Sequence, residues 1–171
     1  LRVAVVMLRA VIMGVAGSGK TSVGVALAER IGAAYIDGDD LHPKSNVAKM
    51  SAGTALSDED RLPWLRQVGA TLHAAQGPTL VGCSALKRRY RDIIRETAGR
   101  PVLFIHLCGS RQVIAARMAQ RAGHFMPVSL LESQFAALEP LGDDEAGFTV
   151  DIDQELDRVV AAAAGLIKGM R

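Results

Sequence analysis

The chain has 171 residues, of which 49% are hydrophobic and 22% are charged. This length fits a single domain, and the composition is typical of a soluble globular protein rather than a disordered one. The formal net charge of +2 is too small to indicate a dedicated nucleic-acid binder.

The cysteines and the apolar runs indicate where in the cell the protein is expected. Cys83 and Cys108 have neither CxxC spacing nor a second pair beside them, so we expect reduced thiols and no zinc site. The longest unbroken apolar run, residues 159–167, has nine residues, far short of the roughly 20 that span a bilayer. We interpret residues 1–9 as an N-terminal extension rather than a signal peptide. These features favour a cytoplasmic protein with no membrane partner.

Short apolar runs alternate with helical patterns in chain order. Strands are expected at residues 10–13, 34–37, 79–83, 102–107 and 148–151, and most are continuously apolar, as strands covered on both faces are. Helices are expected between them at residues 21–31, 58–75, 87–98 and 111–121, with a last one around 156–167. Ser57 and Ser110 are predicted N-caps, and Gly99 is a predicted helix end. This alternation predicts an α/β three-layer sandwich with a mainly parallel sheet.

A glycine-rich segment follows the first expected strand and matches G-x-x-x-x-G-K-[ST]. It comprises Gly14, Val15, Ala16, Gly17, Ser18, Gly19, Lys20 and Thr21. Glycines let the backbone fold tightly enough to point N–H groups at phosphate oxygens, and the following helix adds its positive N-terminal end. Lys20 would reach the β- and γ-phosphates and the Thr21 hydroxyl would bind Mg²⁺. The segment therefore predicts a site for ATP, or another nucleoside triphosphate, with magnesium.

Carboxylates follow the second expected strand, in the sequence Asp37-Gly38-Asp39-Asp40. At the carboxyl end of a strand beside the phosphate loop, one carboxylate can help to hold Mg²⁺, for which Asp37 is the candidate. The other can orient or deprotonate an attacking hydroxyl. The alternative is an Asx-turn with helix capping. The third strand leads into Ser84 with no aspartate at its end, which disfavours a GTPase or a motor ATPase.

Two arginines, Arg117 and Arg121, are four residues apart on one face of an expected helix. In a small kinase, arginines at such a position neutralise charge on the transferred phosphoryl group. The alternative is a solvated helix face.

Several longer segments resemble the gluconokinase family. They are Asp37–Pro43 (DGDDLHP), Asn46–Leu65, Cys83–Asp92 (CSALKRRYRD), Arg121–Met126 (RAGHFM) and Val150–Gln154 (VDIDQ), in addition to the phosphate loop. The resemblance runs from about residue 10 to residue 167. It implies ATP-dependent phosphorylation of D-gluconate on its 6-hydroxyl, the fold of shikimate and nucleoside-monophosphate kinases with a five-stranded parallel sheet in the order 2-3-1-4-5, and a homodimer.

The same resemblance implies roles for particular residues. Asp39 would orient or deprotonate the attacking hydroxyl, residues 40–75 would form a substrate-binding lobe, and residues 121–128 would form a lid. Arg117 and Arg121 match the lid arginines, and Asp153 and Gln154 match the loop near the adenine. Candidates for binding gluconate are His42, Lys49, Arg61, Lys87, Arg88 and His124; a small polyhydroxy acid needs a cation for its carboxylate and several polar partners for its hydroxyls. Two alternatives are a kinase for shikimate or another aldonate, and a nucleotide-gated binding module.

Overall fold

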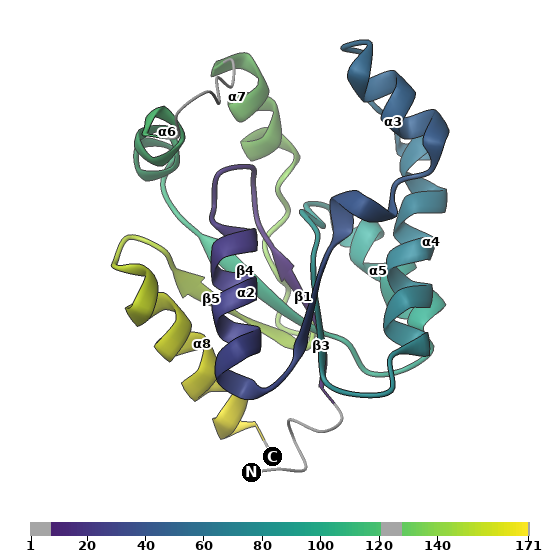
Figure 1. Ribbon diagram of the computed structural model, residues 1–171. Helices are drawn as coiled ribbons and strands as arrows, with labels where there is room; N and C mark the ends of the chain where they lie inside the picture. The colour runs from purple at the N-terminus through teal and green to yellow at the C-terminus, as the bar shows by residue number, and fades with distance from the viewer. Residues whose placement is uncertain (1–7, 121–127, 171) are drawn as a thin grey trace.

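A single parallel sheet forms the centre of the computed structural model, which describes residues 8–120 and 128–170 (Figure 1). Its strands lie in the order β2-β3-β1-β4-β5, which confirms the predicted order. Their bounds are β1 Arg9–Met13, β2 Ala34–Asp37, β3 Thr79–Gly82, β4 Leu103–Cys108 and β5 Gly147–Asp151. All four neighbouring pairs are parallel.

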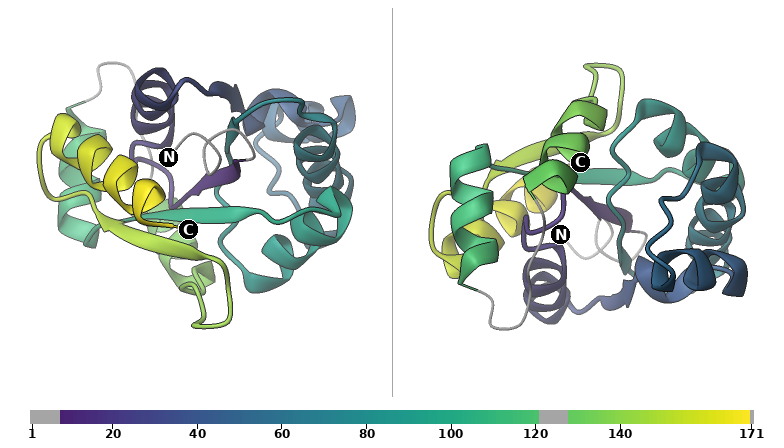
Figure 2. Two further views of the ribbon diagram at one scale, coloured as in Figure 1. Left: turned by 90° about the horizontal axis from the view of Figure 1, so that it is seen from below. Right: turned by 90° about the horizontal axis from the view of Figure 1, so that it is seen from above.

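Eight helical segments surround or follow the strands in the described part of the chain. They are α2 Lys20–Ile31, the 3-10 helix η1 Gly38–Leu41, α3 Lys44–Ser51, α4 Asp58–Ala74, α5 Arg88–Ala98, α6 Arg111–Ala119, α7 Val128–Ala137 and α8 Leu156–Gly169. Figures 1 and 2 show α4 and α5 together on one side of the sheet and α2 and α8 on the other. None of the helices in this part of the chain combines the length and the apolar character needed to cross a membrane.

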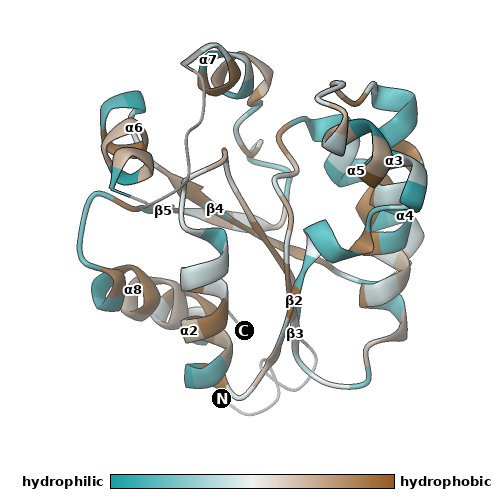
Figure 3. Cartoon of the chain, turned by 45° about the horizontal axis from the view of Figure 1, so that its top comes forward, coloured by the Kyte–Doolittle hydropathy of each residue, from teal (hydrophilic) through white to brown (hydrophobic). Residues whose placement is uncertain are grey.

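Burial on both faces of the sheet explains the unbroken apolar strands. Along β1, Ala10 and Ile12 pack into the core beneath α2 and α8, whereas Val11 and Met13 pack into the core beneath α4 and α5. Figure 3 shows the strands mainly in the hydrophobic colour, with the hydrophilic segments on the surrounding helices and loops. The two cores hold the carboxyl ends of the strands in a fixed arrangement, which is where an open α/β sheet binds its ligands.

The predicted helix signals act as expected. Ser57 and Asp60 form a reciprocal capping box at the start of α4. The Ser110 side chain accepts a hydrogen bond from the Val113 amide, and Gly99 ends α5 with φ of 59°. The helices α3 and α7 and the segment η1 were not predicted.

Some boundaries differ from the sequence prediction. The interpretation of residues 1–9 as an extension places Arg9 outside the fold, but Arg9 is the first residue of β1. Its guanidinium donates hydrogen bonds to the Leu72 and Ala75 carbonyls at 2.8 and 2.9 Å, and the Leu8 carbonyl accepts from the Thr79 amide. The sheet therefore begins earlier in the chain because polar contacts to the end of α4, rather than apolar character, hold this residue.

Candidate active site

The phosphate loop joins β1 to α2 and leaves the start of the helix available to an anion. Gly17 and Gly19 have φ of 79° and 91°, a region that residues with a Cβ rarely adopt. A Cβ at Gly17 would also come within 2.9 Å of the Met118 sulfur on α6. Gly19 is the N-cap of α2 and, having no side chain, provides no side-chain cap, which suits a helix N-terminus that binds an anion.

Lys20 and Gln134 hold this loop from two sides. The Lys20 ammonium donates to the Gly14 and Val15 carbonyls at 3.0 and 3.1 Å, which places its charge over the loop. The Gln134 side chain on α7 accepts a hydrogen bond of 2.8 Å from the Ala16 amide. The phosphate loop is thus connected to a helix more than 100 residues further along the chain.

Two carboxylates follow β2, as predicted. The Asp37 side chain caps η1 by accepting a hydrogen bond of 2.9 Å from the Asp39 amide, so the capping interpretation is correct for one of its oxygens. Burial and the nearby Asp37 carboxylate raise the pKa of Asp39, while Lys20 and His42 oppose the shift. Asp39 therefore lies within electrostatic reach of the phosphate-loop lysine and is a stronger proton acceptor than an ordinary aspartate.

His42 follows η1 and is fixed in one orientation. Its ring stacks on Trp64 with the centroids 4.1 Å apart, and the Trp64 indole N–H donates to the Gly38 carbonyl at 2.8 Å. The Asn46 amide nitrogen donates to the Asp60 carbonyl and lies 3.2 Å from His42 Nδ1. Since this nitrogen can only donate, Nδ1 accepts and the proton of the neutral ring is on Nε2. Burial lowers the pKa of His42, which favours this neutral form.

The candidate substrate-binding cations differ in how they are paired. Lys49 forms an ion pair of 2.8 Å with Asp60, and hydrogen bonds from Lys49 and from the Ser57 backbone lower the pKa of Asp60 to about 2. Arg61 and Lys87 instead share one carboxylate, that of Asp58, at 3.6 and 3.5 Å. This group of three therefore carries one uncompensated positive charge.

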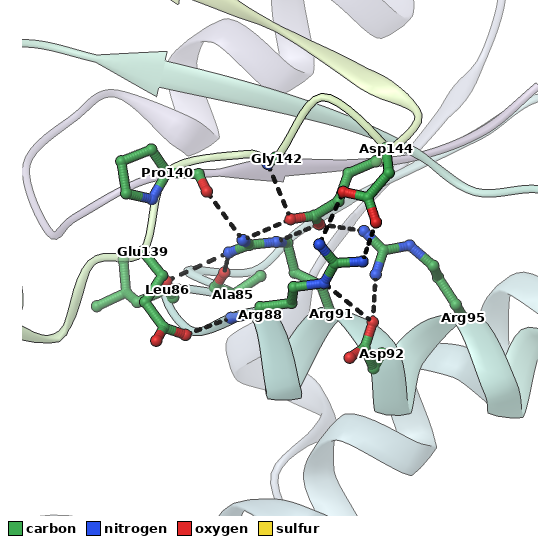
Figure 4. Close-up of polar contacts among 11 residues, drawn as sticks. Ala85, Leu86, Arg88, Arg91, Asp92, Arg95, Glu139, Pro140, Gly142 and Asp144 are labelled. Carbon is green, nitrogen blue, oxygen red and sulfur yellow. Dashed lines mark hydrogen bonds and ion pairs between the residues drawn. The ribbon is translucent and has the colours of Figure 1, made fainter.

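Arg88 instead contacts the loop between α7 and β5 (Figure 4). It donates to both carboxylate oxygens of Asp144, at 2.8 and 2.6 Å, and its backbone amide donates to the Glu139 side chain at 2.7 Å. The structure brings Arg88 to this loop and not to the cluster of Arg61 and Lys87.

A buried arginine lies beside it. The Arg91 side chain is fully buried and donates to the Glu145 carboxylate at 2.7 and 2.9 Å. It also donates to the Ala85 and Leu86 carbonyls at 2.9 and 3.2 Å. Ala85 has φ of 45°, a strained conformation for a residue with a Cβ, so Arg91 helps to hold the turn that positions Lys87.

Arg117 contacts the predicted nucleotide loop. Its guanidinium donates to the Ile152 and Gln154 carbonyls. The Asp153 amide donates to the Asp151 side chain at 2.8 Å, and the Gln154 side chain donates to the Asp151 carbonyl at 2.7 Å. The structure therefore brings Arg117, Asp153 and Gln154 together at the carboxyl end of β5. Arg121, His124 and most of the expected lid lie outside the described residues.

Sequence reasoning missed four residues of this site. Asn46, Asp58 and Tyr90 lie within the segments that carry the family resemblance, so those segments were a signal for them. Gln134 lies in a stretch without a motif, and no sequence signal indicated that it contacts the phosphate loop.

Comparison with known proteins places the chain in a family. A family model described as "AAA domain" matches residues 10–141. The thermosensitive gluconokinase of Escherichia coli K12 is 46% identical over 166 residues, covering 94% of this chain and 88% of that protein. The chain belongs to the gluconokinase family. The gluconokinase of Gluconobacter oxydans is also 46% identical, over 88% of this chain and 85% of its own length.

Solved structures show the same relationship. A crystal structure of a gluconokinase from Sinorhizobium meliloti 1021 superimposes with a TM-score of 0.87 at 46% identity, covering 94% of this chain and 91% of that one. Shikimate kinase from Aquifex aeolicus has a TM-score of 0.60 at 13% identity over 95% of this chain and 97% of its own. That similarity concerns the fold alone and confirms the predicted P-loop kinase architecture.

Proposed function

We propose that this protein transfers the γ-phosphoryl group of ATP to the 6-hydroxyl of D-gluconate, giving 6-phosphogluconate. The observation that carries the proposal is a continuous series of charged and polar groups from the phosphate loop to a cationic cluster. Lys20 is within electrostatic reach of Asp39, Asp39 of His42, and His42 of Arg61. A six-carbon acid has a carboxylate at one end and the reacting hydroxyl at the other, which suits such a series.

The phosphate loop would hold the triphosphate. The uncapped start of α2 provides N–H donors, and Lys20 neutralises charge on the β- and γ-phosphates. The loop of Asp153 and Gln154 would lie against the adenine. We expect Arg117 and Arg121 to neutralise charge on the transferred group, as the family resemblance implies.

Magnesium would be held by Thr21 and Asp37 together with the phosphates. The fit rests on Asp37 and Asp39, whose carboxylates lie close enough that Asp37 raises the pKa of Asp39. Mg²⁺ is usually bound by one or two carboxylates and substrate phosphates. When bound, the metal would neutralise phosphate charge; Asp37 has one oxygen engaged with the Asp39 amide and a second for this contact.

Asp39 would orient the 6-hydroxyl and accept its proton. Its raised pKa makes the carboxylate a better acceptor, and Lys20 nearby favours the ionised form. The Nε2–H of His42 would donate to another substrate hydroxyl. Its ring is held by Trp64 and Asn46, so the donor direction is set before substrate binds.

Arg61 and Lys87 would bind the carboxylate of gluconate, because they alone among the four described candidate cations share a single counter-charge. Lys49 and Arg88 are already paired with Asp60 and Asp144. We expect Arg61→Ala and Lys87→Ala to raise the KM for gluconate about tenfold or more. Lys49→Ala and Arg88→Ala should have smaller effects in the same steady-state assay.

A coupled ADP-release assay with a panel of acceptors tests the function itself. We expect turnover with D-gluconate and little with shikimate or other aldonates, since a site with specific hydroxyl partners rejects acids that lack them. Turnover with another acid but not with gluconate would contradict the substrate. An equal rate of ADP release without any acceptor would indicate a nucleotide-gated module instead.

The oligomeric state and the cellular location are also part of the proposal. We expect a homodimer, which light scattering after size-exclusion chromatography would detect. We also expect a cytoplasmic enzyme, in keeping with the free thiols of Cys83 and Cys108.

A further inference from the structure

Asp58 lies between two cations at the start of α4. Its Oδ1 is 3.6 Å from Arg61 Nη1 and its Oδ2 is 3.5 Å from Lys87 Nζ. The Tyr90 hydroxyl donates a hydrogen bond to Oδ1, and this bond and the Lys87 charge lower the pKa of Asp58. Asp58 is therefore ionised at neutral pH, and its oxygens accept hydrogen bonds but cannot donate them.

The side chains of Asp58, Arg61 and Lys87 are accessible to a ligand, and Tyr90 packs against the two cations. The exposed fractions of the side chains are 39% for Asp58, 32% for Arg61 and 37% for Lys87. The Tyr90 ring lies under both cations, with its centroid 5.7 Å from the Arg61 guanidinium carbon and 5.5 Å from Lys87 Nζ. A small molecule can thus reach all three polar ends while Tyr90 keeps them together.

A carboxylate that binds here meets charges of both signs. Arg61 and Lys87 attract it, and Asp58 repels it. If the neighbouring carbon carries a hydroxyl, that hydroxyl can donate to Asp58 and offset the repulsion. If it does not, Asp58 loses hydration and gains no partner, which is how a polar site rejects an analogue lacking one group.

We propose that Asp58 is a specificity-determining residue that accepts a hydrogen bond from the hydroxyl next to the acceptor's carboxylate, so that the enzyme selects 2-hydroxy acids. This inference rests on the proposed function, because it takes Arg61 and Lys87 as the carboxylate-binding pair. It assigns to Asp58 a contact with substrate in addition to its position in the first turn of α4.

The test compares D-gluconate with 2-deoxy-D-gluconate, which retains the 6-hydroxyl. We expect the unmodified enzyme to prefer gluconate in kcat/KM by about tenfold or more. In Asp58→Asn the repulsion of the carboxylate is lost for both acids, but gluconate also loses its strong acceptor, because a neutral amide oxygen is a weaker one. The KM for gluconate should therefore rise relative to that of the deoxy acid. The KM for the deoxy acid should fall, because the repulsion is gone. The preference should therefore shrink about threefold to tenfold.

Glu59→Gln is the matched control, because Glu59 is an exposed acid in the same turn of α4 and lies outside the cluster. It should leave both KM values unchanged. A variant with a purely structural defect would raise both KM values by the same factor, and such a parallel change in Asp58→Asn would overturn the proposal. If Asp58→Asn does not fold, Tyr90→Phe removes the hydrogen bond that orients the carboxylate and should reduce the preference in the same direction; an unchanged preference would then refute the role.

The two proposals fail differently. If the unmodified enzyme releases no ADP in response to gluconate, the proposed function is wrong. If gluconate is phosphorylated but the preference over the deoxy acid does not depend on Asp58, only the specificity inference is wrong.

Discussion

The buried ion pair of Arg91 and Glu145 provides a prediction whose magnitude follows from the structure. The Glu145 carboxylate accepts hydrogen bonds from Arg91, Arg95 and the Gly142 amide, and its side chain is 1% exposed. Although burial opposes it, these donors lower the pKa of Glu145 from 4.5 to about 2. A shift of this size corresponds to about 3 kcal/mol, and removing one partner of a buried pair typically costs about 3–5 kcal/mol.

We therefore expect Glu145→Gln to lower the free energy of unfolding at pH 7 by about 3 kcal/mol. Urea denaturation followed by circular dichroism measures it. The contribution of Glu145 is complete above its unfolded pKa near 4.5 and disappears as pH falls toward about 2. The difference between the two proteins should shrink over that interval.

Asp144→Asn is the control, because it removes an exposed ion pair at the neighbouring position. The Asp144 side chain is 67% exposed, and such exposed pairs contribute little to the free energy of unfolding. A loss in Glu145→Gln no larger than in Asp144→Asn would refute the reasoning, as would a difference between the unmodified protein and Glu145→Gln that stays constant down to pH 2.

Four further variants test the site. Lys20→Ala should reduce kcat at least about 100-fold in the ADP-release assay, because phosphate positioning and charge neutralisation are lost together; near-normal kcat would exclude its role. Asp39→Asn should lower kcat more than it raises the KM for gluconate and should abolish the acid limb of the pH profile, which lies above pH 3.8 because burial raises the pKa of Asp39; an unchanged limb would point to another group. Trp64→Phe keeps a ring against His42 but leaves the Gly38 carbonyl without its donor, so a loss of about 1–2 kcal/mol in urea denaturation is expected. Gln134→Leu leaves the Ala16 amide unpaired and should raise the KM for ATP about fivefold or more, and an effect on gluconate alone would argue against its contact with the phosphate loop.

The fold could be predicted because its signals are local. The strands are continuously apolar, the caps Ser57 and Ser110 precede their helices, and the phosphate loop marks the first strand-to-helix junction. The helix α3 escaped prediction because it is only eight residues long and buries only Asn46; its apolar residues Val47 and Met50 are exposed. The helix α7 has an apolar stripe, with Leu131, Phe135 and, just after the helix, Leu138 in or against the core, but no Ser, Thr, Asp or Asn stands just before Val128 in the sequence to mark its start.

The site was predictable in its residue types but not in their pairing. The sequence indicated His42, Arg61, Lys87 and Arg88 as substrate-binding candidates. The structure brings Arg61 and Lys87 to the Asp58 carboxylate, with His42 within electrostatic reach of Arg61. It pairs Arg88 with Asp144, 56 residues away. Such long-range contacts depend on how the loop after α7 folds back onto α5, which no local pattern encodes.

That loop and its helix have a mechanical consequence. Gln134 contacts the phosphate loop, and Glu139, five residues later, accepts from the Arg88 amide and donates its own amide to the Leu86 carbonyl. Residues 134–139 thus connect the phosphate loop, proposed to bind ATP, with the segment of Leu86 and Arg88 next to the proposed gluconate site, and the length of this connection is fixed by contacts at both ends. Inserting or deleting one residue in the helical part of this span, positions 134–137, would rotate one anchor relative to the other by about 100° of helical turn, so this part should tolerate substitutions far better than changes in length.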